Sequence, residues 1–239
     1  MRPPCTGPIQ LVAGLTITGG GERIEWLRDT IDPYAFHLDI PAGVSEITVE
    51  FQWLTQPDSS QWRVVMTPAI VNMEWEKAIL YPAGYFANQI QVAASIRLPE
   101  GWNYGTALTT TTFADGVASF EPTDLYTLVD SPMFAGAHFR RIDRLFGSRH
   151  FDHYEFLVAL TRQLGGIGLE HHRSSENTMS PDFFTNWSAS AGDRGLLPHE
   201  YVHSWNGKFR RPADELTANY NVASQNTLLW VYEGQTEYW

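Results

Sequence analysis

Residues 199–203 read His199-Glu200-Tyr201-Val202-His203, and this stretch decides how the C-terminal part of the chain must fold. On an α-helix, residues four positions apart lie one turn apart on nearly the same side of the axis. Both imidazoles can then reach one zinc ion. Glu200 lies beside them and can accept a proton from an attacking water molecule. The pattern predicts a helix with two zinc ligands and a general base; the alternative is a helix that carries two ordinary surface histidines.

A third protein ligand is expected, because a catalytic zinc site has three protein ligands and one open position for water. Glu233, 30 residues after His203, is the best candidate. It is a carboxylate in an apolar and aromatic stretch, where a charged side chain needs a partner such as a metal ion. Glu237, one helical turn later, could accept the second N–H of a ligand histidine; the alternative is a solvated helix face. The predicted site is one Zn²⁺ held by His199, His203 and Glu233.

Helices should surround this site. Apolar residues at helical spacing predict one helix over residues 152–164. The helix that carries the two histidines should run over residues 195–206, and Gly207 is a natural residue to follow its C-terminus. Residues 168–171 resemble a short strand between the two helices.

A third helix should carry Glu233. Ser224 is a suitable N-cap for it. The helical pattern still runs at Trp239, the last residue of the sequence. A chain that stops inside a helix is expected to be cut short before its fold is complete.

The N-terminal part, residues 1–130, has a residue pattern typical of β-strands. Residues 46–51 alternate polar and apolar side chains, as a strand with one solvated face should. The predicted strands span residues 9–18, 36–40, 46–51 and 89–98. Strands at this spacing suggest an antiparallel sandwich. The expected fold class is therefore α+β, with a β-sandwich-like domain over residues 1–130 and a helical domain over residues 131–239.

The composition excludes several classes of protein. With 239 residues and a net charge of −11, the chain is a poor candidate for binding nucleic acid or an anionic membrane surface. One cysteine allows no intrachain disulfide. No apolar run is long enough to span a membrane, and the N-terminus lacks the apolar stretch of a secretory signal. A soluble protein of the cytoplasm or periplasm is expected, and its oligomeric state is open.

Four stretches together resemble a known family. They are residues 199–212 (HEYVHSWNGKFRRP), residues 228–239 (LLWVYEGQTEYW), residues 150–177 and residues 80–102. They are similar to the zinc peptidases typified by glycyl aminopeptidase, which are gluzincins and carry a PDZ domain after the catalytic domain. The resemblance implies a β domain whose start is missing here. It also implies a thermolysin-like catalytic domain that lacks its C-terminal helices and the PDZ domain.

The resemblance assigns roles to the residues of the motif. It implies that His199, His203 and Glu233 bind zinc and that Glu200 is the general base. In gluzincins a later Tyr or His stabilises the oxyanion, and that residue would lie beyond Trp239.

A second, looser resemblance concerns Gly168-Leu169-Glu170-His171. It is similar to the G-x-M-E-N strand of related aminopeptidases, whose Glu binds the free amino group of the substrate. A carboxylate at this place favours exopeptidase action, because a terminal ammonium can neutralise it. Glu170 and Gly168 are therefore candidate substrate-binding residues, and the alternative for Glu170 is an exposed strand edge.

The expected activity is zinc-dependent hydrolysis of peptide bonds, with a peptide as the binding partner. By resemblance, the enzyme would release small N-terminal residues such as Gly or Ala. One alternative is an endopeptidase with the same chemistry. Another is a non-catalytic binding module with a structural zinc, although such a site has no need of Glu200; the β region could also bind a protein partner.

Overall fold

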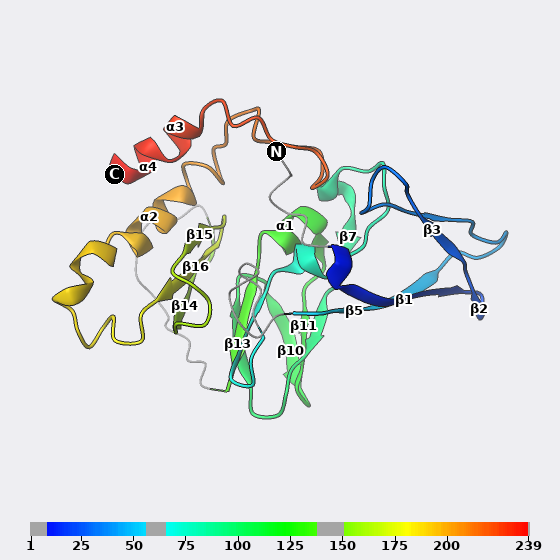
Figure 1. Ribbon diagram of the computed structural model, residues 1–239, viewed down its shortest axis with the longest axis horizontal. Coiled ribbons are helices and arrows are strands. Elements are labelled where there is room, and N and C mark those ends of the chain that lie inside the picture. Colours follow the sequence, from blue (N-terminus) through cyan, green and yellow to red (C-terminus); the bar gives the residue numbers. More distant parts are fainter. Residues whose placement is uncertain (1–8, 56–65, 138–150, 239) are drawn as a thin grey trace.

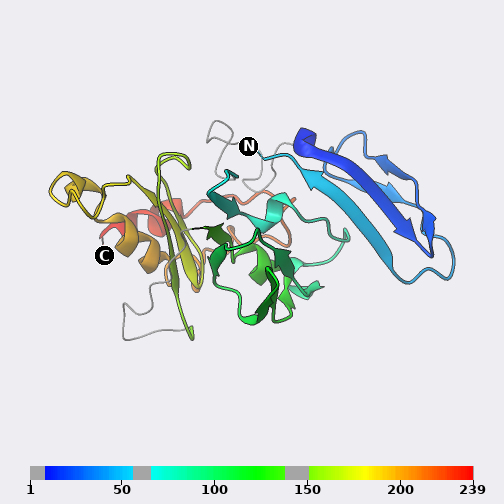
Figure 2. The ribbon, with the colours of Figure 1, turned by 90° about the horizontal axis from the view of Figure 1, so that it is seen from below.

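The structure, a computed structural model, describes residues 9–55, 66–137 and 151–238 (Figure 1). Three parts follow one another along the longest axis of the molecule: a protruding N-terminal sheet, a central group of small sheets, and a C-terminal sheet covered by helices (Figures 1 and 2). Within the described ranges, no helix is long and apolar enough to cross a membrane.

The N-terminal part is a three-stranded antiparallel sheet in the order β2-β1-β5, with a small hairpin beside it. Its elements are the 3₁₀ turn η1 (Ile9–Leu11), β1 (Val12–Gly19), β2 (Glu22–Arg23), β3 (Trp26–Arg28), β4 (Phe36–Leu38) and β5 (Ile47–Trp53). Half-buried and exposed residues alternate strictly along β5. The strand predicted from the alternation of residues 46–51 is therefore confirmed.

The central part consists of small antiparallel sheets around the main hydrophobic core. Its elements are β6 (Ile70–Met73), η3 (Trp75–Lys77), η4 (Ala87–Gln89), β7 (Gln91–Val92), β8 (Ser95–Arg97), β9 (Asn103–Thr106), β10 (Thr110–Ala114), β11 (Val117–Phe120), β12 (Thr123–Asp124), α1 (Leu125–Val129) and β13 (Met133–Gly136). Leu125, Leu128 and Met133 are fully buried in this core. The mostly β character expected of the N-terminal part is confirmed, although its strands form several sheets of two or three strands.

The C-terminal sheet has the order β14-β16-β15, formed by β14 (Glu155–Leu160), β15 (Gly168–Glu170) and β16 (Ser174–Met179). Strand β14 runs parallel to β16, and β15 runs antiparallel to it. The helix predicted over residues 152–164 is wrong, because residues 155–160 form β14. Leu157 and Ala159 point into a small core with Phe134, so the apolar spacing also fits the two-residue period of a strand.

The helices lie on one side of this sheet (Figures 1 and 2). They are η5 (Ala189–Asp193), α2 (Leu196–His203), α3 (Leu229–Tyr232) and α4 (Gly234–Tyr238). Helix α2 packs on β15 and β16, and α4 packs on α2. Helix α2 lies within the predicted limits of residues 195–206.

The third predicted helix begins later than expected. Ser224 does not cap a helix; its hydroxyl donates to the side chain of Asn226 at 2.6 Å. Asn226 has a φ of 54°, which is outside the right-handed helical region. Helix α3 therefore starts only at Leu229, after this turn.

A buried polar network joins the central part to the C-terminal part. Asn72 of β6 donates to Oε2 of Glu176 at 2.8 Å. His171 lies between Glu176 Oε1, at 3.2 Å, and Asp130 Oδ1, at 3.4 Å. Lys208, in the loop after α2, lies 3.2 Å from the same oxygen of Asp130. Because buried charges are stable only with partners, this network holds the loop after α2 against the central part.

The network makes the stability of the protein depend on pH. Burial alone would lower the pKa of His171, but the hydrogen bonds to Asp130 and Glu176 outweigh it and raise the pKa from 6.5 to about 9. The folded protein thus holds a proton more tightly than the unfolded chain, so this stabilisation is complete below pH 6.5 and is lost as pH rises through 9. Burial, with the charge of Glu176, also raises the pKa of Glu74 from 4.5 to about 8, which has the same sign.

We therefore expect the free energy of unfolding to fall by on the order of 4 kcal/mol between pH 6.5 and 9, with contributions of similar size from the two groups. Urea unfolding at several pH values measures it. The His171→Gln variant should show a flatter profile than the parent. A parent stability that is constant or rises over this range would contradict the prediction.

Candidate metal centre

Helix α2 and the residue that directly follows α3 bring three possible metal ligands together. His199 Nε2 lies 3.1 Å from His203 Nε2. Glu233 Oε2 lies 3.2 Å from His203 Nε2 and 3.5 Å from His199 Nε2. Ligands of a tetrahedral zinc ion, at bonds of about 2.0–2.1 Å, are separated by roughly 3.3 Å. In the part of the chain that the structure describes, these residues are the one such group, and their spacing fits zinc.

The protonation of His203 also fits a metal ligand. Its side chain is almost fully buried, and its Nδ1 lies 3.0 Å from the carbonyl oxygen of Asn206. A carbonyl oxygen can only accept, so Nδ1 carries the proton and Nε2 offers its lone pair. Two imidazole nitrogens and a carboxylate oxygen at this spacing repel one another unless a cation or a proton lies between them. The donor set therefore suits a divalent cation.

Asn206 ties the two ligand-bearing helices together. Its side-chain nitrogen donates to the carbonyl oxygen of Val231 at 3.0 Å and to the hydroxyl of Thr236 at 3.1 Å. The same residue thus orients His203 through its carbonyl group and docks α3 and α4 through its amide. The sequence did not suggest this role, because nothing in the linear spacing relates residue 206 to residue 236.

Glu237 lies where the sequence placed it, next to a ligand histidine. Its Oε2 is 3.1 Å from Nδ1 of His199. The angle of this contact falls outside hydrogen-bond geometry, and the Glu237 side chain is 80% exposed. An ion pair this exposed contributes little to stability.

Glu200 is buried and packs tightly against β15. A β-carbon added at Gly168 would lie 1.9 Å from Oε1 of Glu200. The absence of a side chain at Gly168 is therefore what leaves room for the carboxylate. The Tyr154 hydroxyl donates to the carbonyl oxygen of Glu200 at 3.3 Å, and its ring packs on Tyr201 with centroids 4.9 Å apart.

Glu170 ends β15, and its side chain is not a simple exposed strand edge. Its Oε1 accepts a hydrogen bond from the hydroxyl of Tyr232, 62 residues later. Burial would raise the pKa of Glu170, but the charge of Lys208 and the bond from Tyr232 hold the pKa below its ordinary value. The carboxylate is therefore ionised at neutral pH.

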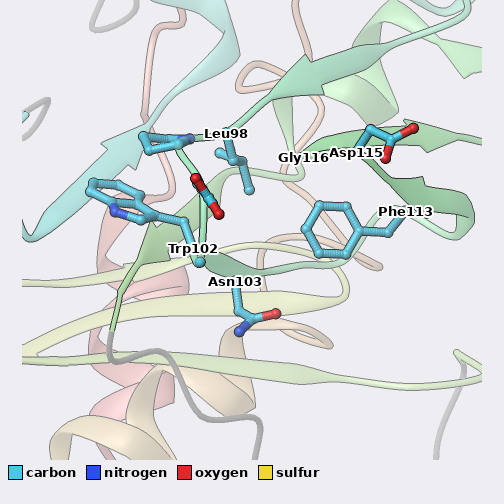
Figure 3. A pocket seen from close by; sticks show the side chains of 9 residues that line it. Leu98, Trp102, Asn103, Phe113, Asp115 and Gly116 are labelled. Atoms are coloured by element: carbon cyan, nitrogen blue, oxygen red, sulfur yellow. The ribbon is translucent and has the colours of Figure 1, made fainter.

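Two hollows lie in different parts of the molecule. A cleft of about 860 Å³ is lined by His199, Glu200 and Gly168 and continues past Arg162 and Asp193. The other, of about 580 Å³, lies in the central part between the turns that follow β8 and β10 (Figure 3). None of the candidate site residues lines that second hollow.

Comparisons with known proteins agree with this architecture. Residues 5–137 match the model of the peptidase M61 N-terminal domain, and residues 193–239 match the model of M61 glycyl aminopeptidase. No curated protein matches the chain.

A crystal structure of an aminopeptidase N family protein from Idiomarina loihiensis has a similar fold, with a TM-score of 0.77 and 18% sequence identity over 95% of this chain. The chain spans 45% of the length of that structure. The two M61 family models cover the sheet-rich N-terminal part and the segment with the three converging ligands. The chain therefore belongs to the M61 family of peptidases.

Proposed function

We propose that the chain carries the zinc site of an aminopeptidase, and that residues 131–239 are its thermolysin-like catalytic domain. The observation that supports this most strongly is the convergence of His199, His203 and Glu233 beside a buried Glu200. A bound Zn²⁺ would supply Lewis acidity, which makes water more acidic and polarises a carbonyl oxygen. The structural match supports the fold alone, so the catalytic roles rest on the donor set and its geometry.

Glu200 is the general base of the proposed reaction. Its carboxylate takes up the proton that the attacking water loses and then delivers it to the leaving amine. Burial beside Gly168 keeps this carboxylate in one place. A purely structural zinc site would not require such a group, which favours the catalytic proposal over a non-catalytic binding module.

Glu170 is the proposed receptor of the substrate's free amino group. It lies at the end of the edge strand β15, whose start at Gly168 contacts Glu200. The strand thus spans the distance between the general base and a second, ionised carboxylate. A peptide with a free N-terminus offers an ammonium group that can pair with Glu170, whereas an acetylated peptide does not. A preference for a small first residue such as Gly or Ala is part of this proposal, and the match of the C-terminal segment to the model of M61 glycyl aminopeptidase supports it.

A comparison of free and blocked substrates tests the proposal. The zinc-loaded chain should cleave Ala-Ala-Phe amide at least about tenfold faster than its N-acetylated form, since one charged hydrogen-bonded pair is worth roughly that factor or more. The Glu170→Gln variant should lose most of this preference while it retains zinc. The control Glu100→Gln, in a turn of the central part, should keep both the preference and the zinc. Equal rates on both peptides would favour an endopeptidase, and no cleavage with a full complement of zinc would favour a binding module.

A further inference from the structure

Tyr232 lies between the candidate metal site and Glu170. It directly precedes Glu233, and its side chain is buried. Its ring packs on the imidazole of His203 with centroids 4.7 Å apart and planes at 37°. At the other end of the ring, its hydroxyl donates to Oε1 of Glu170. One side chain therefore contacts both a proposed metal ligand and the proposed receptor of the amino group.

The position of this ring is tightly confined. A β-carbon at Gly207 would lie 2.5 Å from Cε2 and Cζ of Tyr232. Gly207 also has a φ of 125°, which other residues rarely adopt. Gly207, in the loop after α2, thus provides the space that the phenol ring fills.

The chemistry of the contact leaves Glu170 able to bind a cation. A phenol is protonated and uncharged at neutral pH, so Tyr232 fixes one carboxylate oxygen without neutralising the group. Lys208, the nearby cation, is 3.2 Å from Asp130, so its charge is shared between Asp130 and Glu170. A neutral donor orients a carboxylate without removing its charge, and a supporting hydrogen bond of this kind is what a preorganised binding group requires.

We propose that Tyr232 is a positioning residue that holds the carboxylate of Glu170 toward the amino terminus of the substrate. It acts through Glu170, and its own hydroxyl need not contact the peptide. The inference rests on the proposed aminopeptidase function. It goes beyond that function because it names the residue that fixes the geometry between the amino-group receptor and the metal site.

Peptide binding tests the inference without relying on turnover. The Glu200→Gln chain, loaded with zinc, is titrated calorimetrically with Ala-Ala-Phe amide and with its N-acetylated form. Tyr232→Phe in this background should weaken binding of the free peptide about tenfold, as expected for the loss of one hydrogen bond to a charged group. Binding of the acetylated peptide and the zinc content should not change, because phenylalanine keeps the ring beside His203.

Tyr220→Phe is the matched control. Its hydroxyl donates to the carbonyl oxygen of Tyr126 at 3.4 Å and not to Glu170, so its removal should leave both affinities unchanged. The double variant Tyr232→Phe/Glu170→Gln should bind the free peptide no more weakly than Glu170→Gln alone, because the tyrosine acts only through the glutamate.

Each outcome separates the inference from the function on which it rests. If Tyr232→Phe keeps the full preference for the free peptide, or if the losses in the double variant add, the positioning role is overturned and the aminopeptidase proposal stands. If the parent chain binds both peptides equally, or neither, the aminopeptidase proposal itself is overturned and the inference with it. Thermal unfolding of each variant shows whether the fold is retained.

Discussion

Replacement of Glu233 with alanine should weaken zinc binding by at least about 100-fold, since loss of even an outer partner of a metal ligand costs roughly 10–100-fold. The parent chain should hold about one zinc ion, as a site with three protein ligands does. The physical reason lies in the geometry: Glu233 supplies the anionic oxygen 3.2 Å from His203 and 3.5 Å from His199. Elemental analysis after dialysis and competition with a chelator measure the stoichiometry and affinity.

Glu237→Ala and Glu100→Ala are the controls for this measurement. Glu237 is 3.1 Å from Nδ1 of His199 but highly exposed, so its removal should weaken zinc binding by about tenfold at most. Glu100 lines the hollow of the central part, and its removal should have no effect. Zinc binding that survives Glu233→Ala unchanged, or that falls equally in all three variants, would contradict the assignment of the third ligand.

The candidate ligands could be predicted from two local signals. The two histidines have the spacing of one helical turn, and the glutamate is a charged residue in an apolar stretch. His199 and His203 lie on the same side of any helix that contains them. Glu233 stands out as a carboxylate in an apolar stretch, although the helix that it ends starts at Leu229 and not near Ser224. The local signal for the residue was therefore stronger than the signal for the boundary of its helix.

Strand β14 shows where apolar periodicity fails to predict secondary structure. Tyr154, Leu157 and Leu160 have helical spacing in the sequence, yet residues 155–160 pair in parallel with β16. Every residue of β16 is buried, so its neighbours are selected for packing on a central strand rather than for one solvated face. Short apolar runs of this kind do not distinguish a buried strand from a helix.

The polar contacts that organise the site could not be predicted from the sequence. Tyr232 and Glu170 are 62 residues apart, and His171 and Asp130 are 41 residues apart. Neither pair follows from helical or strand spacing, because each depends on how separate elements pack. What the linear pattern identified were the residues with unusual chemistry, and the structure adds the neighbours that hold them in place.

Replacement of Glu200 with glutamine should reduce kcat of peptide hydrolysis by about 10²–10⁴-fold, the usual contribution of a general base. Glutamine has nearly the same shape but cannot accept the proton, so zinc content and stability should remain close to those of the parent. Stopped or continuous assays with alanyl 4-nitroanilide, together with zinc analysis, measure both quantities. Loss of zinc along with activity would mean that Glu200 supports the metal site and not the proton transfer.

Gly168→Ala tests the same carboxylate by steric means. The added β-carbon would lie 1.9 Å from Oε1 of Glu200 and 2.6 Å from Cδ1 of Leu196, so the carboxylate must turn away from β15. The activity of Gly168→Ala should therefore fall toward that of Glu200→Gln, although Glu200 is still present. Gly166→Ala is the matched control, because a β-carbon there meets no atom within 4 Å, and it should retain the activity of the parent. Full activity in Gly168→Ala would show that the position of Glu200 beside β15 is not the one used in catalysis.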